Sequence, residues 1–185
     1  FKTIDHSKVL PLIEHFMGKQ LILASLNARI VRPSDPAQDL HADIPQSLIK
    51  KTVGFPVMMN AVWMIDEFTM NNGTTQIVSG LHKSGYAQTS TGGEIRYIQK
   101  AVAPLGSVLI FNGQCWDGNG TNTSRRTRNA LFGHYRNGSW LRFQWDPHHR
   151  FKPKWLELLT GRQKQFLRME NGAGSPTAAD FYELL

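Results

Sequence analysis

The chain has 185 residues, of which 41% are hydrophobic, and a formal net charge of +7. This length suits one compact domain, residues 1–185, that can bury a core without disulfide bonds. The single cysteine, Cys115, excludes an internal disulfide and a metal site built of cysteines alone. It is typical of a reducing compartment, so we expect a cytoplasmic protein.

The positive charge does not indicate a nucleic-acid protein, because the basic residues are dispersed along the chain. The densest group is only Arg125-Arg126-Thr127-Arg128. Attraction of an anionic small molecule accounts for the charge at least as well. No apolar run approaches the roughly 18 residues that would span a bilayer, so we expect no membrane partner. Since the chain begins at Phe1 and not at a methionine, we expect that part of the N-terminus is missing.

The first half of the chain predicts one helix and then strands. Residues 8–18 form an amphipathic pattern closed by a glycine, which is typical of a short helix. Residues 21–31 are β-rich, and residues 57–68 read as a long buried strand. Residues 70–73 (Met-Asn-Asn-Gly) predict a hairpin turn, and residues 74–78 the return strand.

The second half continues with short strands separated by polar loops. Residues 95–102, 107–111 and 129–136 are expected strands, whereas residues 84–94 and 112–126 are expected loops.

The C-terminal part is helical in pattern over residues 153–168. A linker at residues 171–176 then leads to a short terminal helix. Short strands with helices at both ends predict a mainly β fold, a double-stranded β-helix (jelly roll, cupin-like) with flanking helices. A doubly wound sheet would need helices between the strands, and these are absent from the pattern.

The most informative motif is His41-Ala42-Asp43. Residues two apart on a strand point to the same face, so the imidazole and the carboxylate can bind one metal ion together. Two histidines and one carboxylate form the facial triad of non-haem Fe(II) oxygenases, which leaves coordination positions open. The third ligand must come from elsewhere in the chain.

Four segments in order carry a specific resemblance to a known family. They are residues 32–43, 63–69, 72–83 and 106–111, and the last continues through Trp116-Asp117-Gly118 to Arg128. With these segments the chain resembles the phytanoyl-CoA dioxygenase family of Fe(II)- and 2-oxoglutarate-dependent oxygenases.

The resemblance implies a set of site residues. His41, Asp43 and Asp117 would bind Fe(II), and Arg128 would bind 2-oxoglutarate, since a guanidinium pairs with a carboxylate through two parallel hydrogen bonds. Thr75 and Gln38 match family positions near this cosubstrate. Trp63 fits a core residue better than a substrate contact, but the strand that contains it lines the family's cavity, so Trp63 is also a substrate-pocket candidate.

Asp117 departs from the family pattern, because family members usually carry Trp-His-Gly at this point. His134 shares strand parity with Arg128, but six residues along a strand span roughly 20 Å, which argues against His134 as the replacement ligand. Three explanations stay open: Asp117 binds the iron, the chain is a catalytically silent relative, or the chain is an altered form of an active enzyme.

The resemblance implies an oxygenase that hydroxylates or otherwise oxidises a C–H bond of a small organic molecule. Met58, Met59, Trp63 and Met64 suggest an apolar substrate of irregular shape, such as a secondary metabolite. The alternative is a silent homologue that serves as a structural or partner subunit of an active oxygenase. Such a subunit would bury a hydrophobic patch in a homo- or hetero-dimer.

Overall fold

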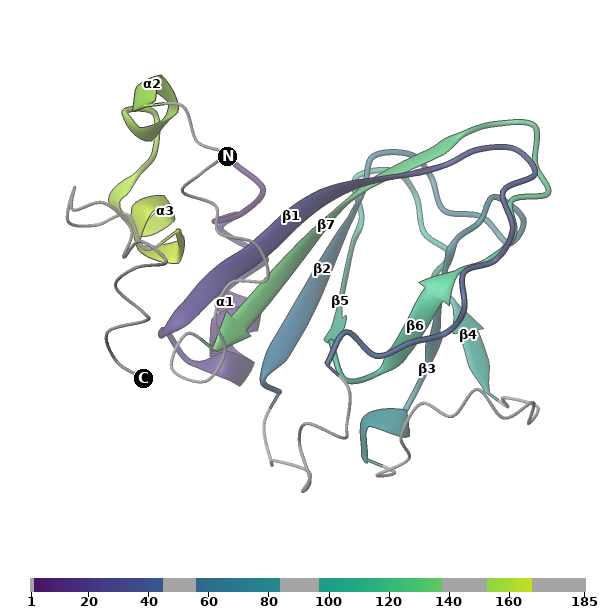
Figure 1. Ribbon diagram of the computed structural model, residues 1–185, viewed down its shortest axis with the longest axis horizontal. Coiled ribbons are helices and arrows are strands. Elements are labelled where there is room, and N and C mark those ends of the chain that lie inside the picture. Colours follow the sequence, from purple (N-terminus) through teal and green to yellow (C-terminus); the bar gives the residue numbers. More distant parts are fainter. Residues whose placement is uncertain (1, 45–55, 84–96, 138–152, 168–185) are drawn as a thin grey trace, which may run out of the picture.

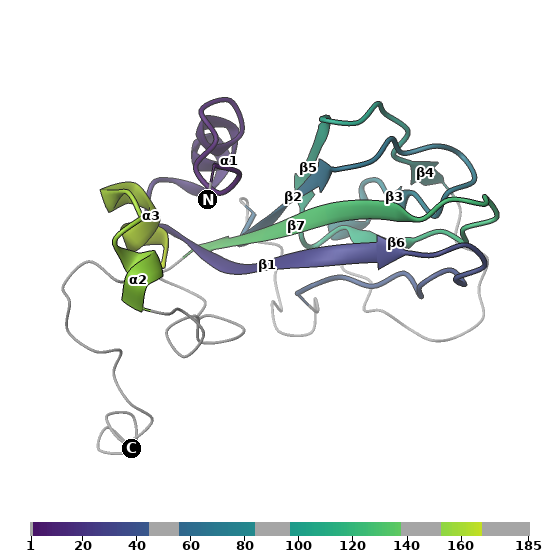
Figure 2. The same ribbon diagram turned by 90° about the horizontal axis from the view of Figure 1, so that it is seen from above.

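The computed structural model describes residues 2–44, 56–83, 97–137 and 153–167. Two antiparallel sheets face each other, and the α-helices gather at one end of the larger sheet (Figures 1 and 2). The strands are β1 (Leu21–Val31), β2 (Met58–Met64), β3 (Thr75–Val78), β4 (Ile98–Lys100), β5 (Val108–Asn112), β6 (Trp116–Asn119) and β7 (Arg128–Asn137). The helices are α1 (Leu10–Met17), the 3-10 turn η2 (Leu81–Lys83), α2 (Pro153–Leu156) and α3 (Gly161–Phe166).

The larger sheet has the strand order β1-β7-β2-β5, so β7 and β2 are its central strands. Directly opposed residues point to the same face, and the face alternates along each strand. The outer face carries Met59, Ala61 and Tyr135, which pack against α1 and α3 in one hydrophobic cluster. The inner face carries Val62 and its cross-strand partner Phe132, which belong to a second cluster.

The smaller sheet has the order β4-β3-β6. Thr75 pairs with Asn119, and Ile77 pairs with Asp117. His41 and Asp117 exchange two backbone hydrogen bonds, of 3.0 and 2.8 Å, and so attach the His41 segment to β6. The motif His41-Ala42-Asp43 therefore lies beside Asp117, although more than seventy residues separate them in the chain.

The fold class predicted from the sequence is confirmed: the protein is mainly β, with two facing antiparallel sheets and flanking helices. The described strands do not close into a barrel. Helix 8–18 and the strands expected at 21–31, 57–68, 107–111 and 129–136 are found with small shifts of their ends.

The hairpin expected at residues 70–73 is wrong. Both edges of β2 are occupied by β7 and β5, so β3 has no place beside β2 and pairs in the other sheet. Gly73 nonetheless makes a sharp bend there with φ at +73°. The bend carries the chain from one sheet to the other.

Two further expectations differ from the structure. The polar stretch 112–126 contains the strand β6, because β3 and the His41 segment supply its hydrogen bonds in spite of the low β-propensity of Asp, Gly and Asn. The helical pattern at 153–168 forms two short helices, α2 and α3. The loop 84–94, the start of the strand 95–102, the linker 171–176 and the terminal helix lie outside the described residues. No described helix has the length and apolar character needed to cross a bilayer.

Candidate active site

A cavity of about 250 Å³ lies between the sheets, at the end where the His41 segment meets β6. Its wall is mostly polar, and only Ala28 and Phe132 among its lining residues are apolar. The lining residues are Asn27, Ala28, Arg29, Gln38, His41, Asp43, Asp117, Asn119, Phe132 and His134. The methionine- and tryptophan-rich wall expected from the sequence does not line this cavity.

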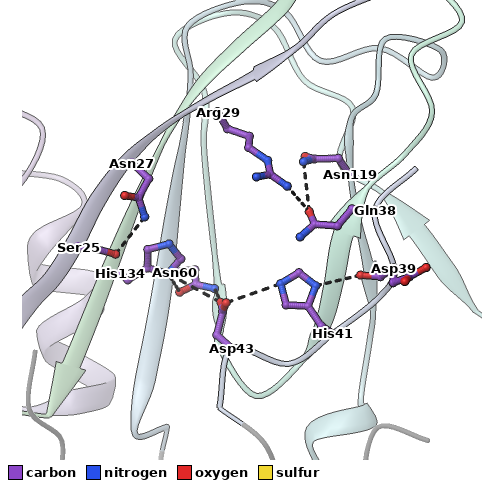
Figure 3. Close-up of polar contacts among 10 residues, drawn as sticks. All are labelled: Ser25, Asn27, Arg29, Gln38, Asp39, His41, Asp43, Asn60, Asn119 and His134. Carbon is purple, nitrogen blue, oxygen red and sulfur yellow. Dashed lines mark hydrogen bonds and ion pairs between the residues drawn. The ribbon is translucent and has the colours of Figure 1, made fainter. Parts of the chain in front are cut away.

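The His41 imidazole has a defined orientation in this cavity. Its Nδ1 lies 3.0 Å from the backbone carbonyl oxygen of Asp39, which can only accept, so Nδ1 carries the proton. The other ring nitrogen, Nε2, lies 3.9 Å from Oδ1 of Asp43 (Figure 3). A backbone partner on the far nitrogen is the usual way to present the other nitrogen of a histidine to a metal ion.

Asp117 is a buried carboxyl group with few hydrogen bonds or positive charges among the described residues to offset the cost of its burial. Its side chain faces inward from β6, and Oδ1 has no hydrogen-bond partner among the described residues. Burial, and after it the charge of Asp43, raises the pKa of Asp117 to about 8, while Arg29 acts in the opposite direction. Two carboxyl groups thus face one cavity without enough positive charge to balance them.

These three side chains fit a divalent cation by donor chemistry and by place, since an imidazole and two carboxylates line one cavity and one buried oxygen lacks a partner. Their present arrangement is more open than a coordination shell. Among the described residues, no three His, Cys, Asp or Glu side chains lie close enough together to bind a metal ion as they stand.

Arg128 is fully buried at the start of β7. Its Nη2 donates to the backbone oxygen of Gly73 at 2.6 Å and to Oδ1 of Asn119 at 2.8 Å, and its guanidinium lies 4.4 Å from the ring centre of Phe68. Nε and Nη1 have no partner within the described residues. Burial, and then the charge of Arg29, lowers the pKa of Arg128 to about 10. The group remains a cation at neutral pH, with two donors unused.

Gln38 lines the cavity, whereas Thr75 and Arg128 are not among its lining residues. Thr75 shares its face of the sheet with Asn119, and its buried Oγ1 is likewise without a described partner. Gln38 accepts through Oε1 from Arg29 at 2.6 Å and from Asn119 at 3.3 Å (Figure 3). Asn119 bonds both Arg128 and Gln38, so it connects the buried arginine to the cavity wall.

Trp63 lies elsewhere. It belongs to the outer face of the larger sheet, where it packs against the cluster that includes α1, with the His6 ring 5.2 Å away. The cavity opens on the opposite face of the same strand. Trp63 is therefore a core residue and not part of this pocket.

Sequence reasoning missed four residues that shape the site: Asn60, Arg29, Asn119 and His134. His134 was set aside because of its distance from Arg128, yet its Nδ1 lies 3.8 Å from Oδ2 of Asp43. The residue that brings His134 into the site is Asp43, which lies on another segment of the chain than Arg128. Strand parity was the available signal, since His134 and Arg128 point to the same face of β7.

The two facing antiparallel sheets with their flanking helices define the class, a cupin-like jelly-roll fold. The chain belongs to the phytanoyl-CoA dioxygenase (PhyH) family, whose model matches residues 1–130. The resemblance inferred from the sequence motifs is thereby confirmed.

Two relatives of this chain are named as dioxygenases. It is 27% identical over 128 residues to dioxygenase af480 of Aspergillus fumigatus, an alignment that covers 68% of this chain and 41% of that protein. It is 34% identical over 106 residues to dioxygenase cdmA of Talaromyces verruculosus, covering 55% of this chain and 35% of that protein. The chain thus spans less than half the length of these relatives.

Solved structures share the fold. A non-heme monooxygenase, ThoJ, in complex with nickel superposes with a TM-score of 0.56 at 14% identity, over 73% of this chain and 52% of that one. AviO1 from Streptomyces viridochromogenes superposes with a TM-score of 0.58 at 16% identity, over 76% of this chain and 62% of that one. At this identity the likeness extends to the fold alone.

Proposed function

We propose that this chain is the double-stranded β-helix part of an Fe(II)- and 2-oxoglutarate-dependent oxygenase that oxidises a C–H bond of a small organic molecule. Asp117 takes the position that a histidine occupies in the family. The membership of the family and the dioxygenase names of its relatives support the reaction class. We propose in addition that the metal is Fe(II), that the cosubstrate is 2-oxoglutarate, and that the site residues have the roles given below.

The observation that carries the proposal is a set of buried polar atoms without described partners, each of the kind that the expected ligands would satisfy. Arg128 offers two nitrogens, Nε and Nη1, without a described partner, and Thr75 offers an unused hydroxyl. Asp117 offers an unused carboxyl oxygen. Buried polar groups are nearly always paired with protein atoms, water or a ligand, so these atoms support the binding of a ligand here. An anion with carboxylate oxygens suits the first two residues, and a cation suits the third.

In this proposal His41, Asp43 and Asp117 hold Fe(II), and Arg128 pairs with the distal carboxylate of 2-oxoglutarate. Bound Fe(II) with 2-oxoglutarate and oxygen supplies the oxidising chemistry. The contribution of the chain is placement and exclusion of water: Asn119 and Gly73 fix the guanidinium, Thr75 adds a hydroxyl, and Gln38 stands at the wall. The polar cavity favours a substrate, such as a secondary metabolite, that carries its own hydrogen-bonding groups.

A second candidate is a catalytically silent homologue that supports an active partner in a dimer. The open arrangement of His41, Asp43 and Asp117 favours it, because no three ligating side chains within the described residues are grouped for a metal ion. The cavity favours the enzyme over the silent homologue, because about 250 Å³ of space is open in it. A silent subunit would be expected to fill this space with side chains.

The test is an anaerobic titration of the purified protein with Fe(II) and 2-oxoglutarate, monitored by the weak visible charge-transfer band of the chelated complex. An Asp117→His variant is titrated in parallel. A band in the native protein supports Asp117 as a working ligand. A band only in Asp117→His identifies a silent site disabled at one residue. No band in either protein refutes the metal assignment.

A further inference from the structure

Two side chains from the central strands of the larger sheet, one buried and one partly buried, lie against the carboxylate of Asp43. Asn60 on β2 and His134 on β7 are direct cross-strand partners and share the inner face. Nδ2 of Asn60 donates to Oδ2 of Asp43 at 2.5 Å, and Nδ1 of His134 lies 2.9 Å from Oδ1 of Asn60. Figure 3 shows the three side chains meeting beside His41.

The proton positions in this network follow from donor and acceptor chemistry. A carboxylate only accepts, so the amide nitrogen of Asn60 must face Asp43 and its oxygen must face His134. The amide oxygen also only accepts, and therefore Nδ1 of His134 must carry a proton. The network has one consistent direction, from His134 through Asn60 to Asp43.

The two oxygens of Asp43 therefore have different surroundings. Oδ2 accepts from Asn60 and has Nδ1 of His134 at 3.8 Å. Oδ1 lies toward His41, with Nε2 at 3.9 Å. Since one oxygen is occupied, the other is left for a ligand on the His41 side.

We propose that Asn60 and His134 are positioning residues that hold Asp43 as a one-oxygen metal ligand, with Oδ1 turned to the ion. This rests on the proposed function, in which Asp43 and His41 bind a divalent cation. Side chains that fix ligating carboxylates commonly change metal affinity 10–100-fold when they are removed. Neither Asn60 nor His134 would touch the ion.

A purely structural explanation accounts less well for these residue types. The next pair of opposed residues on the inner face of these two strands is Val62 and Phe132. Both are apolar, and they pack in the second hydrophobic cluster. An amide and an imidazole at the adjacent pair are costly to bury unless each polar atom is paired. Asn60 is only 1% exposed, and its pairing is directed at Asp43.

The test uses Mn(II), which binds oxygen and imidazole ligands and is detected when free by electron paramagnetic resonance. We expect Asn60→Val to weaken Mn(II) binding 10–100-fold relative to the native protein. The matched control is Asn129→Val, because Asn129 on β7 also donates through Nδ2 to a carboxylate, Oδ2 of Asp66 at 2.7 Å, but it does not line the cavity. Its affinity should stay within about twofold of native. Equal affinities for native protein and Asn60→Val overturn the proposal.

His134 supplies the conservative comparison. In His134→Gln the new amide can still donate to Asn60, whereas in His134→Phe it cannot. We expect Mn(II) binding to be retained in His134→Gln and weakened in His134→Phe. A structural role alone would not separate the two in this order if both variants unfold at the same urea concentration. Equal affinities for these two variants count against His134 as a positioning residue.

A measurement on the metal-free protein separates this inference from the proposed function. ¹⁵N NMR of the histidine side chains should show His134 with a proton on Nδ1, and Asn60→Val should change that signal. If the native protein fails to bind Mn(II), the proposed function and the ligand role of Asp43 both fall. If Mn(II) binds but His134 is protonated on Nε2 alone, only the inference about Asn60 and His134 falls.

Discussion

Asp117 and Asp43 face one cavity, and burial together with the charge of Asp43 raises the pKa of Asp117 to about 8. This makes the metal-free site sensitive to pH in a defined direction. The folded state keeps a proton on Asp117 that the unfolded chain releases near its ordinary value of 3.8. Between these two pH values the unfolded state binds fewer protons than the folded state. The contribution of Asp117 to the free energy of unfolding is therefore largest at low pH and falls as the pH rises toward 8.

The first prediction follows for Asp117→Asn, which cannot ionise. Without divalent metal, the native protein should lose unfolding free energy relative to this variant by on the order of 1.4 kcal/mol per pH unit between pH 5 and 8. Urea unfolding of both proteins with a chelator present measures the difference. Parallel stability profiles would contradict a raised pKa of Asp117. Addition of Mn(II) should flatten the native profile if the ion binds there.

The second prediction concerns the buried guanidinium of Arg128, whose Nε and Nη1 are unpaired among the described residues. In the presence of Mn(II), 2-oxoglutarate at about 100 times its Kd should raise the unfolding free energy of the native protein by about 2.7 kcal/mol. The Arg128→Met variant should show no such gain, because it keeps a long side chain but has no charge to pair with the carboxylate. Thermal unfolding with and without 2-oxoglutarate measures this.

The control for that experiment is Arg125→Met, since Arg125 belongs to the same basic run but is exposed. It should respond to 2-oxoglutarate like the native protein. A full response in Arg128→Met would remove Arg128 from the proposed cosubstrate site.

The third prediction tests the bend between the sheets. At Gly73 an added Cβ would lie 2.6 Å from Cγ1 of Val31 and 3.1 Å from the backbone oxygen of Gly120. Since φ is also positive there, Gly73→Ala should cost about 2–4 kcal/mol of unfolding free energy. Gly80 has φ at +82° but no atom within 4 Å of the added carbon. Gly80→Ala should therefore cost only about 1 kcal/mol, and urea unfolding of the pair separates crowding from backbone strain.

Some of the fold was readable from the sequence because it depends on local pattern. The strand at 21–31 and the start of β7 at Arg128 follow from runs of β-forming residues bounded by turns. β6 was not readable, since Trp116–Asn119 contains Asp, Gly and Asn and is a strand only through its neighbours. The hairpin failed for a related reason: which strand pairs with β3 depends on the occupied edges of β2.

The shared place of His41 and Asp43 in the cavity could be predicted from the sequence, because the two residues are close in the chain and match a family motif. The environment of Asp43 was not, because Asn60 and His134 reach it from two other segments. Whether Trp63 faces the cavity could not be read from the sequence, because that depends on the parity of β2. Every residue of β2 is buried or nearly so, and a strand apolar on both faces carries no alternation to show which side faces the cavity.

The last prediction uses this difference between the two faces of the larger sheet. Trp63 packs under the helices with Val108 and Ile110, whereas Phe132 lines the cavity. Trp63→Leu should lower the unfolding free energy by about 1–3 kcal/mol through lost packing. It should leave Mn(II) and 2-oxoglutarate affinities unchanged.

Phe132→Leu is the counterpart, and it should alter 2-oxoglutarate affinity because it changes the wall of the cavity itself. Both substitutions shorten a half-buried aromatic side chain in the same sheet, so similar losses of stability are expected and the binding measurements decide between the faces. Isothermal titration of both variants with 2-oxoglutarate in the presence of Mn(II) gives the comparison. Weakened binding in Trp63→Leu with normal binding in Phe132→Leu would mean that the ligand occupies the face under the helices.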